Sequence, residues 1–146
     1  MTAEGASRPV LRESFPGELD SLSSIRAAVR GAAAAARLEV GRSYRLELAV
    51  DEIATNIVVH GYQEARRTGV IRVTIAVDDE SIAVSLEDDA APYDPTRQEL
   101  PSPEDLASLP GDRHAGGLGV MLARGVDQFR YERVGGENRT TLGMRR

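Results

Sequence analysis

Apolar residues recur along the chain with two different periods. In the first, they are spaced three and four residues apart, which is the repeat of an α-helix with one buried face. Two segments have this spacing, at about residues 19–36 and 41–61, with apolar positions at Leu19, Leu22, Ile25 and Val29 and at Leu46, Ala49, Val50, Ile53 and Ile57. The sequence therefore predicts two amphipathic helices.

The second period is the alternation that is typical of β-strands. It occurs at residues 71–77 and 82–86, and the acidic run Asp78-Asp79-Glu80 between them predicts a hairpin turn. A second hairpin is predicted from strands at 128–134 and 139–145, which residues 135–138 join. A short edge strand is expected at about residues 10–15.

Neither period is present between Pro92 and Gly117, and five of the seven prolines lie between Pro92 and Pro110. A connection of this length inside a small domain is usually functional or disordered. We interpret residues 92–117 as a lid over a binding site. A further helix is predicted from about Leu118 to Val126.

The order of these elements predicts the fold class. Helices and hairpins are grouped instead of alternating singly, so the helices are expected to cover one face of a mixed, mainly antiparallel sheet. This arrangement is an α/β two-layer sandwich. A length of 146 residues is typical of one domain, and residues 1–146 are accordingly predicted to form a single domain.

Composition narrows the function classes. The net charge is −5 without a dense block of Lys and Arg, which argues against direct nucleic-acid binding and against binding to an anionic membrane. The absence of cysteine excludes disulfides, thiolate nucleophiles and Cys-based zinc sites. Neither a leader pattern nor a stretch of about 18–20 apolar residues is present, so a cytoplasmic location is expected.

Three polar residues of the second predicted helix, Glu52, Asn56 and His60, follow one another at intervals of four. They share one edge of the apolar stripe. A carboxylate and a carboxamide one turn apart offer oxygen ligands to Mg²⁺, and the carboxylate can alternatively orient an attacking hydroxyl or water. The alternative for this group is an ordinary solvated helix face.

Two further features are suited to a nucleotide. Asp88 lies where an apolar strand meets a turn, a position from which a carboxylate can accept a hydrogen bond from an amino group such as that of adenine. The run Gly116-Gly117-Leu118-Gly119 opens the third predicted helix, where backbone N–H groups and the helix dipole favour phosphate. The alternative for the glycine run is a flexible hinge.

Other nucleotide and hydrolase motifs are missing from the sequence. The chain has neither Gly-x-x-x-x-Gly-Lys-Ser/Thr nor a Gly-x-Gly-x-x-Gly that follows a first strand, which argues against P-loop and Rossmann sites. It also lacks His-Glu-x-x-His and Gly-x-Ser-x-Gly. Zinc-hydrolase and serine-hydrolase chemistry is therefore disfavoured.

Taken together, Glu52-x-x-x-Asn56-x-x-x-His60, the segment that begins at Asp88 and the glycine run at 116–119 resemble the ordered boxes of the GHKL (histidine-kinase-like ATPase) superfamily. The segment Pro92-Tyr93-Asp94-Pro95 resembles, more narrowly, the anti-sigma-factor serine/threonine kinases. The similarity extends from about Leu11 to Met144. It implies the Bergerat ATP-binding fold.

The resemblance implies a site for ATP and Mg²⁺. Asn56 would bind Mg²⁺ and ATP, and Glu52 would be the catalytic base. The remaining residues implied for ATP binding are Asp88, Ala90, Gly116, Gly117, Leu118, Gly119 and one of Thr140 and Thr141, with Asp88 at the adenine amino group and the glycines at phosphate.

The resemblance also implies a regulatory role. Such a kinase holds a sigma factor inactive and phosphorylates a serine on an anti-anti-sigma protein of the STAS type, which together make a partner switch. A homodimer is expected from the same family. Phosphoryl transfer of this kind is mostly positioning and electrostatic stabilisation.

One departure bears on this interpretation. The family normally has glycine where this chain has Ala90, and a left-handed backbone there would cost alanine ~1 kcal/mol or more, weakening nucleotide binding. The alternative functions are a non-catalytic, partner-binding regulatory module with a weakened nucleotide site, and a stand-alone catalytic domain of a histidine kinase that acts on another chain.

Overall fold

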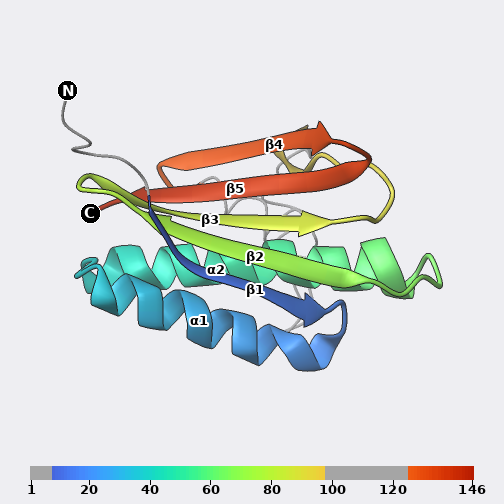
Figure 1. Ribbon diagram of the computed structural model, residues 1–146, viewed down its shortest axis with the longest axis horizontal. Coiled ribbons are helices and arrows are strands. Elements are labelled where there is room, and N and C mark those ends of the chain that lie inside the picture. Colours follow the sequence, from blue (N-terminus) through green and yellow to red (C-terminus); the bar gives the residue numbers. More distant parts are fainter. Residues whose placement is uncertain (1–7, 98–124) are drawn as a thin grey trace, which may run out of the picture.

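The computed structural model describes residues 8–97 and 125–146. In these ranges a five-stranded open sheet packs against a layer that contains two α-helices (Figure 1). The strand order is β1-β2-β3-β5-β4, and every pairing between the described strands is antiparallel. The predicted α/β two-layer sandwich is confirmed, and its described sheet is antiparallel throughout.

The described elements follow the predicted order of edge strand, two helices, hairpin and second hairpin. They are β1 (Arg8–Pro16), the 3₁₀ turn η1 (Leu19–Ser21), α1 (Leu22–Ala35), α2 (Val40–Asn56), the π-helical segment η2 (Ile57–Gln63), β2 (Val70–Val77), β3 (Ser81–Asp88), the 3₁₀ turn η3 (Pro95–Arg97), β4 (Gln128–Val134) and β5 (Glu137–Arg145). β1 lies at the edge of the sheet, as expected. None of the helices within the described ranges combines the length and the apolar character needed to cross a membrane.

Three boundaries differ from the prediction. The first helix starts with a 3₁₀ turn, which is common at helix termini, and the second leaves the α conformation after Asn56 and continues as the π-helical segment. The second hairpin has a two-residue loop, Gly135-Gly136, with φ of 59° and 82°. Since glycine adopts positive φ at no steric cost, β5 already begins at Glu137.

Two predicted segments lie largely outside the described residues. Of the predicted lid at 92–117, the structure describes residues 92–97, which include η3. Of the predicted helix at 118–126, it describes Gly125 and Val126, which form a turn and a bend rather than a helix. Residues 98–124 are not described.

The core lies between the two layers because the central strands β2 and β3 bury alternate residues against the helices. β3 buries Ile82, Val84 and Leu86, and α2 buries Leu46, Val50 and Ile53 in the same cluster. Full burial of an aliphatic side chain is worth about 1.5–3 kcal/mol. This interface holds the end of α2 against the sheet.

The register of β3 and β5 decides which polar side chains face the helices. Asp88 pairs with Asn138 and Leu86 pairs with Thr140, whereas Ser85 pairs with Thr141. Because successive residues point to opposite faces, Asp88, Asn138 and Thr140 lie on the helix side. Thr141 lies on the opposite face of the sheet.

Candidate functional site

A cavity of about 190 Å³ lies between the helix layer and the ends of β3 and β5. The helix layer, the sheet and the segment that follows β3 all contribute to its wall. The lining residues are Ile53, Asn56, Ile57, His60, Gly61, Asp88, Ala90, Ala91, Pro92, Tyr93, Pro95, Asn138 and Thr140. Mostly apolar walls with a few polar groups are typical of a small-molecule site.

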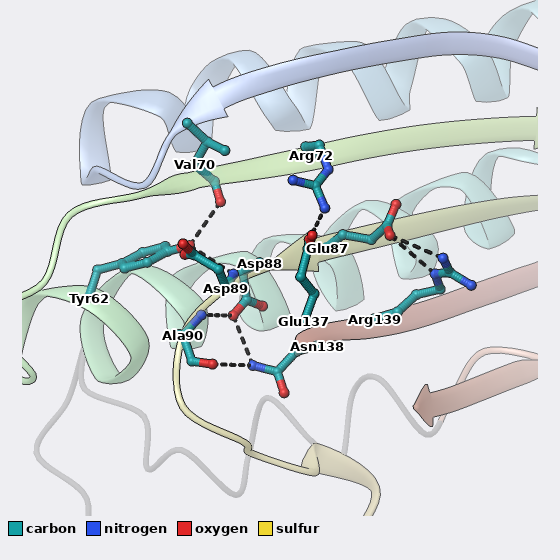
Figure 2. Close-up of polar contacts among 10 residues, drawn as sticks. All are labelled: Tyr62, Val70, Arg72, Glu87, Asp88, Asp89, Ala90, Glu137, Asn138 and Arg139. Atoms are coloured by element: carbon teal, nitrogen blue, oxygen red, sulfur yellow. Dashed lines mark hydrogen bonds and ion pairs between the residues drawn. The ribbon is translucent and has the colours of Figure 1, made fainter. Parts of the chain in front are cut away.

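Asp88 is the buried carboxylate of this cavity, with 3% of its surface exposed. Its Oδ1 accepts hydrogen bonds from the Ala90 backbone N–H at 3.0 Å and from Asn138 Nδ2 at 2.9 Å (Figure 2). Burial raises the pKa of Asp88, while these two hydrogen bonds oppose the rise. Both hydrogen bonds from described residues end on Oδ1, so Oδ2 is the oxygen available to a ligand donor.

Asn56 supplies the polar group on the helix side. Its side chain is buried, and its Nδ2 has no hydrogen-bond partner among the described residues. A buried amide without a partner is costly, and its oxygen and nitrogen positions are interchangeable by a flip, so either atom can meet a ligand. This fits a site that is completed when a ligand binds.

The same residue is suited to Mg²⁺. The ion usually retains several waters and takes one or two protein ligands together with the phosphates of a nucleotide. Within the described ranges, no three His, Asp and Glu side chains are grouped so as to hold a metal ion. Asn56 would hold Mg²⁺ together with the phosphates of a nucleotide.

The other two residues of the helix motif take different positions. Glu52 is half-buried one turn before Asn56 and is not among the residues that line the cavity. His60 lines the cavity at an exposed position, and its Nδ1 lies 2.8 and 2.9 Å from the two carboxylate oxygens of Glu64. Glu52 thus lies one helical turn nearer the N-terminus of α2 than Asn56, outside the cavity wall.

Ala90 does not adopt the left-handed backbone that would be strained for alanine. Among described residues other than glycine, only Arg37 and Arg66 have positive φ. The left-handed penalty is consequently absent at Ala90. Its Cβ instead packs over Gly61, where an added Cβ would lie 2.9 Å from it.

The two candidate threonines are separated by the sheet. Thr140 is buried and lines the cavity. Thr141 lies on the opposite face, where its hydroxyl is 3.3 Å from that of Ser85. The structure therefore brings Thr140, and not Thr141, together with Asp88, Ala90 and Asn56.

The predicted phosphate-binding residues are those of the glycine run at 116–119. Gly116, Gly117, Leu118 and Gly119 lie outside the described residues.

Asn138 is a site residue that the sequence pattern does not predict, because the predicted hairpin loop at 135–138 includes it. The glycine pair at 135–136 was the available signal, since a two-residue loop would have placed Asn138 in a strand.

Comparison with known families agrees with the geometry. The family model of the histidine kinase-like ATPase domain matches residues 15–146. No curated protein matches the sequence significantly. Domains of this family bind ATP, typically with Mg²⁺, and are often ATP-dependent kinases or ATPases. The chain belongs to the histidine-kinase-like, GHKL-type ATPase family.

Proposed function

We propose that this chain is a cytoplasmic anti-sigma factor and protein serine/threonine kinase. It binds ATP with Mg²⁺, sequesters a sigma factor and phosphorylates a serine on a STAS-type anti-anti-sigma protein. It acts as a homodimer without direct contact to nucleic acid or membrane. The observation that carries the proposal is the cavity that combines the Asp88 carboxylate of β3 with the Asn56 amide of α2.

The cavity is suited to a purine base. Asp88 Oδ2 accepts a hydrogen bond from the exocyclic amino group, and Thr140 offers a hydroxyl on the same side of the sheet. Ile57 and Pro92 line the wall and provide apolar surface for the faces of the base. A flat ligand with one polar edge matches this arrangement.

The proposed phosphoryl transfer takes place at Glu52, nearer the N-terminus of α2 than Asn56. Glu52 lies one turn before Asn56, about 6 Å along the helix axis. Bound ATP supplies the phosphoryl group. Glu52 accepts the proton of the serine hydroxyl while the serine oxygen bonds to the γ-phosphorus, and the bond between that phosphorus and the departing ADP oxygen breaks.

Calorimetry of ATP binding, with and without Mg²⁺, tests the site first. We expect Mg²⁺-dependent binding by the wild type and its loss in Asn56→Ala. Folding stability should change little, because Asn56 Nδ2 has no described partner to lose. Thr74→Ala, which lies at the hollow on the opposite face of the sheet, should bind as the wild type does. Failure of a well-folded wild type to bind would overturn the proposed function.

Phosphate transfer distinguishes the proposed kinase from the two alternatives. With a STAS-type anti-anti-sigma protein as acceptor, the wild type should transfer phosphate to serine and not to a serine-to-alanine form of the acceptor. Glu52→Gln should retain ATP binding but transfer at least about 10²-fold more slowly. Binding without transfer would identify a non-catalytic regulatory module, and transfer to a histidine of another chain would identify a histidine-kinase domain.

A further inference from the structure

We propose that Asn138 is a positioning residue that orients the Asp88 carboxylate and fixes the segment after β3 at the ligand cavity. The identity of the ligand rests on the proposed function, whereas the positioning role rests on the contacts of Asn138 alone. Asn138 is the second residue of β5, just after the Gly135-Gly136 loop. Its cross-strand partner is Asp88.

The orientation of the Asn138 amide is fixed by its neighbours. Its Nδ2 faces three oxygens, Asp88 Oδ1 at 2.9 Å, the Ala91 carbonyl at 3.0 Å and the Ala90 carbonyl at 3.2 Å. Its Oδ1 accepts hydrogen bonds from the Tyr131 hydroxyl and, at 3.1 Å, from Arg133 Nη1. A flipped amide would face acceptors with its oxygen and donors with its nitrogen, so only one orientation is compatible.

This orientation determines how Asp88 meets a ligand. Asn138 Nδ2 and the Ala90 N–H both donate to Oδ1, which sets the plane of the carboxylate. The second oxygen then remains for the cavity that Asp88 lines. Without Asn138 the carboxylate would keep one of these two donors and could rotate, so a ligand would meet an acceptor of undefined direction.

The same amide holds the rim of the cavity. Ala90, Ala91 and Pro92 all line it, and the first two have carbonyls that accept from Asn138. Arg133 Nη1 reinforces this contact with a hydrogen bond of 2.9 Å to the Ala90 carbonyl. Asn138 is 4% exposed, and a fully satisfied buried polar group of this kind specifies one local arrangement. The Asn138 side chain thereby links the Asp88 carboxylate to the segment that forms the rim.

The test is a carboxyl-carbon NMR titration of Asp88 in the nucleotide-free protein, compared between wild type and Asn138→Ala. Loss of a donor that favours the ionised carboxylate should raise the pKa of Asp88 above that of the wild type. ATP binding followed against pH should weaken on the acid side at a correspondingly higher pH. Ser85→Ala, on the opposite face of β3, should leave both measurements unchanged.

A second variant keeps the test decisive if Asn138→Ala does not fold. Tyr131→Phe removes one donor to Asn138 Oδ1 and should shift the Asp88 titration in the same direction by a smaller amount. An unchanged Asp88 titration in the folded variants would overturn the positioning role, even if ATP binds. A shifted titration in the variants, together with a well-folded wild type that binds no ATP, would support the positioning role and refute the proposed function.

Discussion

At the scale of single residues, ionisation of the Asp88 carboxylate has opposite effects on folding stability and on ligand binding. Burial raises its pKa, so the folded protein holds the proton more tightly than the unfolded chain does. The stability from this proton is fully present below the unfolded pKa and is lost as the pH rises through the raised folded pKa. The hydrogen bonds that Oδ1 accepts from Asn138 and Ala90 favour the ionised form, which is the form that accepts a hydrogen bond from a ligand.

Asp88→Asn separates these two effects. The asparagine Oδ1 can still accept from Ala90 and Asn138, and its amide carries no charge to bury, so the free energy of unfolding at pH 7 should stay constant or rise by up to about 1 kcal/mol. The new Nδ2 would face the adenine amino group donor to donor, and ATP binding should be lost. Urea unfolding and calorimetry measure the two quantities. A large loss of stability at pH 7 would contradict this account.

Gly61 and Ala90 form a second residue-scale pair, because an added Cβ at Gly61 would lie 2.9 Å from that of Ala90. Gly61→Ala should lower the free energy of unfolding by about 1–3 kcal/mol through overpacking. Ala90→Gly alone should cost only about 0.5–1 kcal/mol, since Ala90 has an ordinary backbone. The double variant should recover part of the loss in urea unfolding, whereas strict additivity would show that the contact is relieved elsewhere.

At the scale of elements, apolar spacing predicted the helices and strands because it reflects burial of one face. It did not predict the end of α2 at Asn56, since apolar spacing continues through Ile57 into the π-helical segment. The choice between Thr140 and Thr141 depends on the register of β3 and β5, which period two alone does not supply. Asn138 contacts Asp88 across 50 positions of sequence, so no local pattern reveals their contact.

Tyr62 holds the π-helical segment η2 against the sheet. Its buried hydroxyl lies 2.9 Å from the Val70 carbonyl and 2.8 Å from Asp89 Oδ1, and both can accept its hydrogen bond (Figure 2). Gly17 and Gly69 adjoin the ring so closely that a Cβ at either would lie 2.5 or 2.6 Å from it. Burial and then the Asp89 contact raise the pKa of Tyr62, so the hydroxyl remains a donor at physiological pH.

Tyr62→Phe should therefore lower the free energy of unfolding by about 1–2 kcal/mol, because it removes the part-buried hydrogen bonds of the hydroxyl with the Val70 carbonyl and the Asp89 carboxylate. The ring and its packing between the glycines would be retained. Tyr44→Phe is the matched control, because Tyr44 is 60% exposed and should unfold as the wild type does. Urea unfolding compares the three proteins. Equal stability of all three would show that the Tyr62 hydroxyl does not anchor η2.

At the scale of the whole molecule, the two faces of the sheet differ. One face packs against the helices and contributes Asp88, Asn138 and Thr140 to the cavity. The other is polar and carries ion pairs such as those of Arg139 with Glu87 and Glu132, each at 3.2 Å. The cavity thus lies where the helix layer and the sheet layer meet. A ligand that contacts both Asn56 and Asp88 connects the two layers and must stabilise the folded state as a whole.

Thermal unfolding measures this coupling between layers. At a free concentration about 100 times its dissociation constant, a ligand that binds only the folded state adds about 2.7 kcal/mol. For a domain of this size each kcal/mol raises Tm by about 3 °C, so ATP with Mg²⁺ should raise the Tm of the wild type by roughly 8 °C.

The same ATP and Mg²⁺ concentrations should leave the Tm of Asn56→Ala and of Asp88→Asn unchanged, since each variant removes the contact on one layer. Thr74→Ala should shift as the wild type does. If both site variants kept the full shift, ATP would be stabilising the protein from another site. If only Asp88→Asn lost it, binding would depend on the sheet layer alone, and Mg²⁺ would not be held through α2.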